Sequence, residues 1–279
     1  MKSKIFLTFI LLSGLLLSAQ QNNNKPNLIV IMTDDMGYAD VGFNGCKDIP
    51  TPNIDSIAYN GAHIVNGYVS FPVCGPSRAG FITGRYQDRF GFTTNPTIDP
   101  ANNIAGLPLD EKTIAEVLRT KGYKSAVVGK WHLGTHPNFH PLNRGFDYFY
   151  GFLSGGHNYF VNQLTIENLE NVRSKWAWYS TKLKENHKTL EFEDYKTDYL
   201  TDEFSEAALS FIDKQAKNDQ AFFLFLAYNA PHTPMHATEK YLSRFPEIQD
   251  KKRKTYAAMV SAVDDGIGLV LEALKEMVK

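Results

Sequence analysis

The sequence predicts an α/β fold, with a mostly parallel central sheet flanked by helices. Two unbroken apolar runs, residues 27–32 and residues 221–228 (AFFLFLAY), are typical of strands that are covered on both faces. Two periodic segments, residues 201–217 and residues 254–278, are typical of amphipathic helices that lie against such a sheet. Because strands and helices alternate, we expect the strands to run parallel, with the run at 221–228 as a central strand.

Shorter elements lie between these segments and are marked by residues that start or stop helices. Thr51 and Pro52 predict a helix start, and Gly61 predicts its end. Residues 153–194 are rich in Asn, Tyr, Trp and charge and have little periodicity, so we expect an excursion from the sheet that lies over a binding site. The other predicted elements are a strand at residues 63–69, a helix at 77–83 ended by Gly84, a helix from Asp110 to Lys121 and a strand at 123–128.

Residues 1–19 have the pattern of a secretory signal peptide. Lys2 and Lys4 precede an apolar run at residues 5–17, and two small residues follow it. The run is too short to span a membrane comfortably, and Gln20 stands where a lipidated protein would carry Cys. We therefore expect an exported protein, periplasmic or secreted, with no stable membrane anchor.

Composition limits the classes of function that fit the rest of the chain. We assign residues 20–25 to a polar spacer and residues 26–279 to a single domain, whose length is ample for one large core. The formal net charge of −1 offers no basic field for nucleic acid, so any anion must bind at a local site. An exported protein can form disulfides, so pairing of Cys46 with Cys74 is one alternative for its two cysteines.

Polar groups follow each predicted strand. In chain order they are Asp34 and Asp35, Cys74 and Arg78, Lys130 and His132, and His232. Open α/β sheets bind ligands at the carboxyl ends of their strands, so we expect these side chains to surround one site.

The pair Asp34 and Asp35 suggests a metal-binding site, and the pair Cys74 and Arg78 suggests an anion-binding site. Asp34 and Asp35 are hard oxygen ligands suited to Ca²⁺ or Mg²⁺, although one of them could instead cap a turn. Pro76 suits a helix's first turn, which places Cys74 at a helix N-terminus where backbone N–H groups favour an anion. Arg78 adds a planar fork of donors for an oxyanion. A reactive thiolate and a packed or disulfide-bonded cysteine are the alternatives for Cys74.

The remaining groups are imidazoles and a cation. Lys130 and His132 share one face of an extended chain, where the lysine can neutralise an anion and the histidine can transfer a proton. The alternative for His132 is a core histidine beside Trp131. His232 lies in the sequence PHTP, whose prolines keep it out of a helix, and its alternative is a rigid structural turn.

Four segments that contain these residues resemble motifs of the arylsulfatase-like type I sulfatases, a family of the alkaline-phosphatase-like superfamily. They are residues 27–40 (NLIVIMTDDMGYAD), 74–85 (CGPSRAGFITGR), 129–134 (GKWHLG) and 231–234 (PHTP). The segments lie in the family's order, and the resemblance covers essentially all of the chain after the spacer. The extended C-x-P-S-R motif is highly specific.

The resemblance implies a sulfuric ester hydrolase and a role for each residue. A maturation enzyme would oxidise Cys74 to formylglycine, whose hydrate attacks the sulfur of a sulfate ester. The implied ligands of Ca²⁺, with Mg²⁺ less favoured, are Asp34, Asp35 and the modified Cys74. Arg78 would hold the hydrate, and His132 would hydrogen-bond it. Lys130 and His232 would bind the sulfate.

The chain also departs from the family. Members run well beyond this length and carry a downstream Asp-Asn or Asp-His metal pair and another sulfate-binding Lys, none of which can be assigned here. Asp264 and Asp265 fit an ordinary helix. We therefore expect an N-terminal fragment whose catalytic domain is incomplete and which is inactive or poorly folded alone. Two alternatives to a sulfatase are a phosphodiester or phosphonate hydrolase on the same fold and a non-catalytic protein that binds sulfated glycans.

Export and aromatic side chains suggest a class of substrate. Export favours a sulfated polysaccharide or glycosaminoglycan, by analogy with the family. Residues 143–160 and the pair Trp176 and Trp178 offer aromatic surface for sugar rings, although aromatic stretches more often belong to a core. His157, between Gly156 and Asn158, is a candidate substrate contact.

Overall fold

The structure is a computed structural model that describes residues 25–218 and 220–277. Its sheet has six strands, β1 (Leu28–Asp34), β2 (Lys124–Lys130), β3 (Tyr148–Phe152), β4 (Lys184–Glu185), β5 (Lys188–Thr189) and β6 (Phe222–Pro231). The strand order is β1-β6-β2-β3-β4-β5. The first four strands in this order pair in parallel, and the short β4 and β5 are antiparallel to their neighbours. The predicted mostly parallel α/β fold is confirmed.

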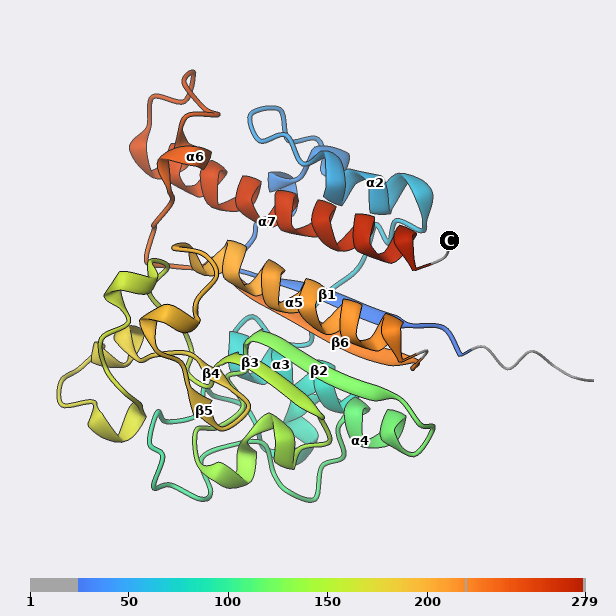
Figure 1. Ribbon diagram of the computed structural model, residues 1–279, viewed down its shortest axis with the longest axis vertical. Coiled ribbons are helices and arrows are strands. Elements are labelled where there is room, and N and C mark those ends of the chain that lie inside the picture. The colour runs from blue at the N-terminus through green and yellow to red at the C-terminus, as the bar shows by residue number, and fades with distance from the viewer. Residues whose placement is uncertain (1–24, 219, 278–279) are drawn as a thin grey trace, which may run out of the picture.

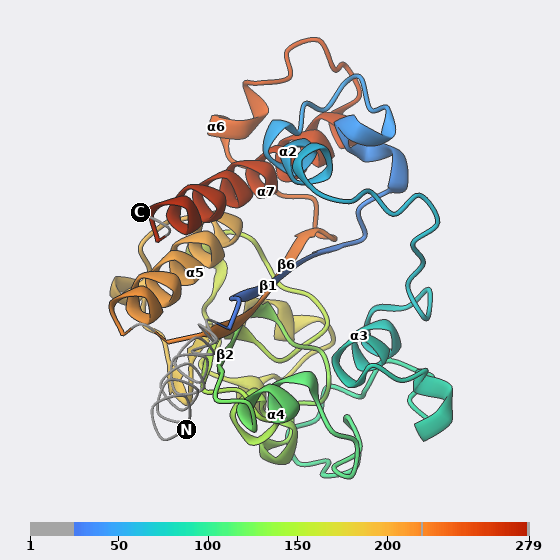
Figure 2. The same cartoon turned by 90° about the vertical axis from the view of Figure 1, so that its right-hand side faces the viewer.

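The helices lie on both faces of this sheet. They are α2 (Pro52–Asn60), α3 (Cys74–Thr83), α4 (Ile114–Arg119), α5 (Leu200–Lys217), α6 (Glu239–Leu242) and α7 (Lys251–Glu276). Figure 1 shows α5 and α7 along one face of the sheet, and Figure 2 shows α3 and α4 on the opposite side, with α2 beside α7. The two long helices predicted from periodicity are thus confirmed as α5 and α7.

Strand β6 separates two hydrophobic cores, as its unbroken apolar run predicts. All ten of its residues are buried, and it pairs with β1 on one side and β2 on the other. Leu224 and Leu226 belong to the core beneath α5 and α7, whereas Phe223 and Phe225 belong to the core that includes α3 and α4. This alternation follows from the period of two in a strand.

The predicted strand at residues 63–69 is wrong, because this segment forms an irregular connection between α2 and α3. Its apolar side chains are largely exposed, with Ile64 at 75% and Tyr68 at 89%. A strand needs a neighbour to share its hydrogen bonds, and an apolar pattern does not reveal whether one exists. Residues 27–32 contribute to β1, whose side chains pack against both cores as predicted, with Ile29 and Ile31 on one face and Val30 and Met32 on the other. These side chains stay partly exposed, because β1 pairs only with β6 among the described residues.

Two further differences concern local signals. The helix predicted from Asp110 begins at Ile114, because Thr113 and Glu116 form a reciprocal capping box at its start. Strand β3 was not predicted, since its short aromatic sequence reads equally well as part of a loop. The predicted excursion at residues 153–194 is mostly irregular and also contains the short β4 and β5.

The strands bring their carboxyl ends together through a close approach of β2 and β6. Gly129 has φ 108°, and a Cβ atom there would lie 2.1 Å from the Ala227 carbonyl oxygen, so only glycine fits. The next residue, Lys130, ends β2. Asp34, which ends β1, is in register with Pro231, which ends β6.

Three predictions from the sequence concern the signal peptide, membrane contact and the two cysteines. Residues 1–24, which contain the predicted signal peptide and most of the spacer, lie outside the described residues. Among the helices that the structure describes, none has the length and apolar character needed to cross a membrane. Cys46 and Cys74 are both free, so they do not pair with each other.

Asp264 holds α2 against α7. Its buried carboxylate accepts hydrogen bonds from Asn53 N at 3.1 Å, Ile54 N at 2.8 Å and Asn53 Nδ2 at 3.0 Å. These donors belong to the first turn of α2, whose backbone N–H groups have no partner within the helix. Its neighbour Asp265 instead pairs with Arg244 at the surface.

We predict that Asp264→Ala lowers the free energy of unfolding by about 2 kcal/mol, because it leaves buried donors without an acceptor. Urea unfolding followed by circular dichroism measures the change. Asp265→Ala is the matched control, and loss of its partly exposed ion pair should cost no more than about 1 kcal/mol. Equal losses in the two variants would contradict the assigned role of Asp264.

Candidate active site

A buried group of three charges, Asp34, Arg78 and Lys130, lies at the carboxyl end of the sheet. Lys130 Nζ donates a hydrogen bond to Asp34 Oδ2, and Arg78 Nη2 lies 3.7 Å from the same oxygen. Arg78 Nη1 donates to the Lys130 carbonyl at 2.7 Å, which ties α3 to the end of β2. The structure thus brings together three of the residues predicted for the site. We call them the charge cluster.

The charge cluster keeps Asp34 ionised and leaves a surplus of positive charge. Burial alone would raise the pKa of the Asp34 carboxyl, but the positive charges of Arg78, Lys130 and His232 outweigh it and lower this pKa below its ordinary value. One carboxylate faces two permanent cations in a place that water hardly reaches. The cluster is therefore electrostatically suited to a further anionic group.

Asp35 and His232 lie at the rim of the cluster. His232 Nε2 is 3.7 Å from Asp35 Oδ2, since both residues follow strands that end side by side. Asp35 has φ 62°, a left-handed conformation that is uncommon outside glycine. This turn directs Asp35 into solvent, with 65% of its side chain exposed, while the preceding Asp34 stays buried.

Cys74 is the first residue of α3, as its position before Pro76 predicts. Asn95 positions this helix start, because its Oδ1 accepts a hydrogen bond from Gly75 N at 2.9 Å and lies 3.6 Å from Cys74 Sγ. Cys74 and Arg78 are four residues apart, so they share one face of α3. The thiol therefore lies on the side of the helix that meets the charge cluster.

His132 is buried next to the cluster and is held neutral. Burial and then the positive charges of Lys130, Arg78 and His232 place its pKa well below the ordinary value. Its φ of 60° is left-handed, like that of Asp35. Two buried atoms here, His132 Nδ1 and Arg78 Nη2, have no hydrogen-bond partner among the described residues. Buried polar groups without partners are rare and indicate a missing ligand or group.

A divalent cation fits this site in part. Asp34 and Asp35 offer carboxylate oxygens, which are the donors that Ca²⁺ prefers, but its shell takes about six to eight oxygens. Within residues 25–218 and 220–277, no group of three or more His, Cys, Asp or Glu side chains is arranged to hold a metal ion. The two aspartates would therefore fill only part of a calcium shell.

His157 does not join these residues. Its side chain is fully buried, packs against Phe152 in a tilted arrangement with 4.6 Å between ring centroids, and contacts Asn158 O and Thr181 Oγ1. A contact between His157 and a substrate would require this packing to open. We therefore leave that prediction out of our proposal and interpret His157 as a structural residue.

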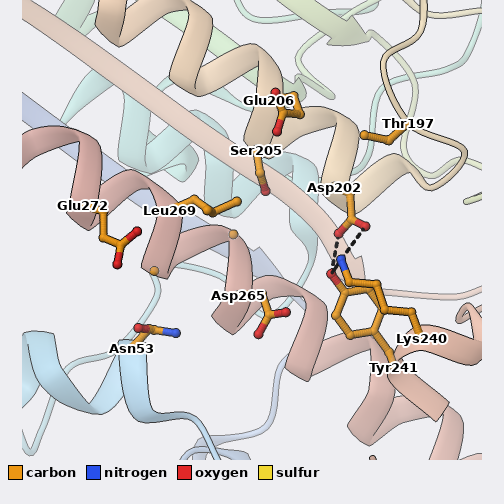
Figure 3. Close-up of a pocket in the computed structure, with 12 residues that line it drawn as sticks. Asn53, Thr197, Asp202, Ser205, Glu206, Lys240, Tyr241, Asp265, Leu269 and Glu272 are labelled. Atoms are coloured by element: carbon orange, nitrogen blue, oxygen red, sulfur yellow. Dashed lines mark hydrogen bonds and ion pairs between the residues drawn. The ribbon is translucent and has the colours of Figure 1, made fainter. Parts of the chain in front are cut away.

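The cavity shown in Figure 3 is separate from the charge cluster. It has a volume of about 430 Å³ and lies between α5, α6 and α7. Asp202 accepts hydrogen bonds from Lys240 and Tyr241 there, and further carboxylates line the wall. The lining carboxylates are Asp202, Glu206, Asp265 and Glu272. This excess of negative charge disfavours an anionic ligand, so the cavity does not extend the site.

Comparison with known proteins identifies the family. A family model described as Sulfatase matches residues 26–279. The chain belongs to the sulfatase family. It is 34% identical over 276 residues to the N-acetylgalactosamine-6-sulfatase of Mus musculus, covering 96% of this chain and 50% of that protein. It is 29% identical over 296 residues to arylsulfatase G of Rattus norvegicus, covering 99% of this chain and 54% of that protein.

Solved structures agree with this assignment. The crystal structure of Ps i-CgsB matches this sulfatase with a TM-score of 0.83 and 46% identity, over 91% of this chain and 55% of that chain. A second structure of that protein, in complex with k-i-k-neocarrahexaose, also gives a TM-score of 0.83, at 45% identity and the same coverage. The chain thus spans about half the length of the relatives that it matches.

Sequence reasoning missed several residues of this sulfatase's site. Asn95 lies 21 residues beyond Cys74 in an irregular segment, so no motif or period links the two. Asn229 is buried with both polar side-chain atoms unpartnered among the described residues, and it directly follows the apolar run of β6. Tyr179 packs against Gly156 in the excursion, next to Gly155, which His132 contacts. The sequence signal for Asn229 was a polar residue directly after an apolar strand run.

The buried histidines predict acid sensitivity of the fold. Burial lowers the pKa of His157 to about 4, whereas the unfolded chain binds this proton near the ordinary value of 6.5. The contribution of the buried neutral His157 to the free energy of unfolding is therefore complete above pH 6.5 and is lost as the pH falls towards 4. We predict that the free energy of unfolding of His157→Gln depends less steeply on pH in this window, by up to about 1.4 kcal/mol per pH unit. Urea unfolding between pH 7 and 4 measures the slope.

His63→Gln serves as the control, because His63 is exposed. It should keep the pH dependence of the unchanged protein. If His157→Gln kept the same dependence as well, the assignment of His157 as a buried neutral histidine would be wrong.

Proposed function

We propose that this protein is a carbohydrate sulfatase. It would hydrolyse the sulfate ester of a sulfated sugar in an active site whose nucleophile is residue 74. The observation that carries the proposal is the charge cluster, in which Arg78 and Lys130 place two positive charges beside Asp34 and the helix that begins with Cys74. Relatives support the substrate class, since they include an N-acetylgalactosamine-6-sulfatase and a protein bound to k-i-k-neocarrahexaose.

Residue 74 supplies the nucleophile once a maturation enzyme has oxidised the Cys74 thiol to an aldehyde, formylglycine, which takes up water. A hydrated aldehyde carries two hydroxyl groups on one carbon. The oxygen of one hydroxyl bonds to sulfur while the bond between sulfur and the ester oxygen breaks, and the sugar leaves as its alcohol. The second hydroxyl then loses its proton, the carbonyl re-forms, and sulfate leaves with the attacking oxygen. A plain serine hydroxyl could not release the sulfate in this way.

The neighbouring side chains have roles that match their protonation and packing. Arg78 Nη2 and His132 Nδ1 would hold the hydrate, and their lack of a hydrogen-bond partner among the described residues supports this assignment. Because its pKa is lowered, His132 is neutral near pH 7 and can accept the proton that the second hydroxyl loses. Lys130 and His232 would bind the sulfate oxygens and offset the charge that develops on them.

Asp34 and Asp35 would hold a Ca²⁺ ion, with residue 74 as a further ligand and Mg²⁺ as the less favoured ion. A divalent cation there would make a bound hydroxyl more acidic and therefore more nucleophilic. The ionised state of Asp34, which the charge cluster maintains, supports this assignment.

Export to the periplasm or the medium is part of the proposal. It rests on the signal-peptide pattern at residues 1–19 alone. An extracellular location would give the enzyme access to sulfated polysaccharides outside the cell.

We predict that the complete gene product, produced together with a formylglycine-generating enzyme, contains an aldehyde at residue 74. Conversion of the thiol lowers the mass of the peptide that contains Cys74 by about 18 Da, which peptide mass spectrometry detects. The same preparation should release sulfate from a sulfated oligosaccharide, measured by ion chromatography. Cys74→Ala should release none, because it cannot form the aldehyde.

Other outcomes of this experiment would overturn the proposal. An unmodified thiol in protein that binds but does not cleave sulfated sugars would favour a glycan-binding protein. Faster cleavage of phosphate diesters than of sulfate esters would favour a phosphoesterase.

We predict that His232→Gln lowers kcat/KM for a sulfated substrate by about 10²-fold, as expected when one group that stabilises developing charge is removed. Steady-state sulfate release measures the change. His236→Gln is the matched control, because His236 lies four residues further on and stacks on Phe160 rather than facing Asp35. A similar loss in both variants would indicate a folding effect and argue against His232 as a sulfate ligand.

A further inference from the structure

Three aromatic side chains, Trp176, Trp178 and Tyr179, form a continuous cluster in the excursion from the sheet. Trp178 and Tyr179 stack at 4.1 Å between ring centroids, and Trp176 lies 6.0 Å from Trp178 and 6.3 Å from Tyr179. The short 3₁₀ helix Ala177–Ser180 carries the last two. We call these three residues the aromatic cluster.

The inner end of the aromatic cluster lies next to the active site. A Cβ atom on Gly156 would lie 2.8 Å from the Tyr179 hydroxyl, and a Cβ atom on the preceding Gly155 would lie 2.6 Å from His132 Nε2. Tyr179 and His132 therefore pack against consecutive glycines of one loop, in space that side chains would fill. Burial and the negative charges of Cys74, Asp34 and Asp35 also raise the pKa of Tyr179, consistent with this position.

The outer end of the cluster reaches solvent. Trp176 is 58% exposed, with φ 70°, and Lys175 Nζ lies 5.1 Å from the centre of its ring. Contiguous exposed apolar surface, in contrast to single exposed side chains, is typical of ligand-binding and interaction sites. The cluster thus runs from the neighbourhood of Cys74 to a positively charged outer rim.

The aromatic cluster is not part of a core. The aromatic residues that follow β2 are core residues, since Phe149, Tyr150, Phe152 and Tyr159 are all buried. Neither hydrophobic core includes Trp176, Trp178 or Tyr179. Packing in a hydrophobic core therefore explains the aromatic residues at 149–159 but not the aromatic cluster.

We propose that Trp176, Trp178 and Tyr179 form a sugar-binding subsite, which stacks on rings of a sulfated oligosaccharide whose ester lies at residue 74. This inference rests on the proposed function and names the residues that select the carbohydrate. Sugar rings have apolar C–H faces and polar edges, and aromatic side chains offer flat apolar faces with a polar N–H or O–H at the edge. Lys175, at the outer rim, would lie beside a further sulfate group of the chain.

The tryptophans provide a direct readout of binding. The chain has three tryptophans, and the third, Trp131, is fully buried and donates its N–H to Phe139 O at 2.8 Å. The part of a fluorescence change on addition of an oligosaccharide that is lost when Trp176 and Trp178 are both replaced by Ala therefore reports on these two side chains. This measurement needs no turnover.

The experiment titrates k-i-k-neocarrahexaose and a chondroitin 6-sulfate hexasaccharide into the complete gene product carrying Cys74→Ala, which prevents hydrolysis. We expect at least one of them to change the fluorescence, and Trp176→Ala or Trp178→Ala to raise its Kd about tenfold, measured by calorimetry, as loss of one aromatic contact would. Phe192→Ala is the matched control, because Phe192 is 57% exposed in the same excursion but outside the cluster. It should leave Kd unchanged.

A second measurement separates this proposal from the proposed function. In the active enzyme, Trp176→Ala should lower kcat/KM for the bound oligosaccharide about tenfold more than kcat/KM for 4-nitrophenyl sulfate, which is too small to reach the outer cluster. Oligosaccharide binding that depends on the aromatic cluster, without sulfate release by the enzyme with Cys74 intact, would contradict the hydrolase assignment but not the subsite. Oligosaccharide binding that is equal in the Trp176→Ala, Trp178→Ala and Phe192→Ala variants, or no binding of either hexasaccharide, would overturn the subsite.

Discussion

The buried ion pair between Lys130 and Asp34 is the interaction on which the rest of the site depends. Removing each ion from water costs several kcal/mol, so such a pair persists only where its geometry and its other hydrogen bonds are favourable. Here Arg78 provides the additional contact, since it approaches Asp34 and also donates to the Lys130 carbonyl. The result is a rigid group of charges with one more cation than anion. An anionic ligand would complete it, which is the electrostatic basis for the proposed sulfate ester substrate.

The charge cluster and His232 at its rim lie together because three strands far apart in the sequence end at the same edge of the sheet. Asp34 ends β1, Lys130 ends β2 and His232 follows β6, and the glycine at position 129 lets β2 approach β6 closely just before Lys130. The strand that lies between the other two, β6, is buried along its whole length. Packing of an apolar strand thus sets the positions of polar groups that have no attraction for the core.

Much of this arrangement could be predicted from the sequence, because strand ends and helix starts have local signals. The run AFFLFLAY marks β6, and Pro76 marks the start of α3 at Cys74. Features that depend on partners distant in the sequence could not be predicted. Residues 63–69 have a strand pattern but no strand beside them, and His157 has the setting of a ligand contact but is enclosed by Phe152 and Thr181. Asn95 supports Cys74 from an irregular segment that carries no motif.

In the proposed enzyme, the charge cluster and the aromatic cluster divide recognition of the substrate between them. The cations of the first respond to the charge of a sulfate group, which is the same on every sulfated molecule, so they cannot distinguish one sugar from another. Selection of the carbohydrate must come from groups outside the cluster that touch the ring itself. The excursion that carries Trp176, Trp178 and Tyr179 meets the buried His132 through the small residues Gly155 and Gly156. In the proposed enzyme, substitutions in this excursion would therefore change the preferred sugar while Arg78 and Lys130 stay in place.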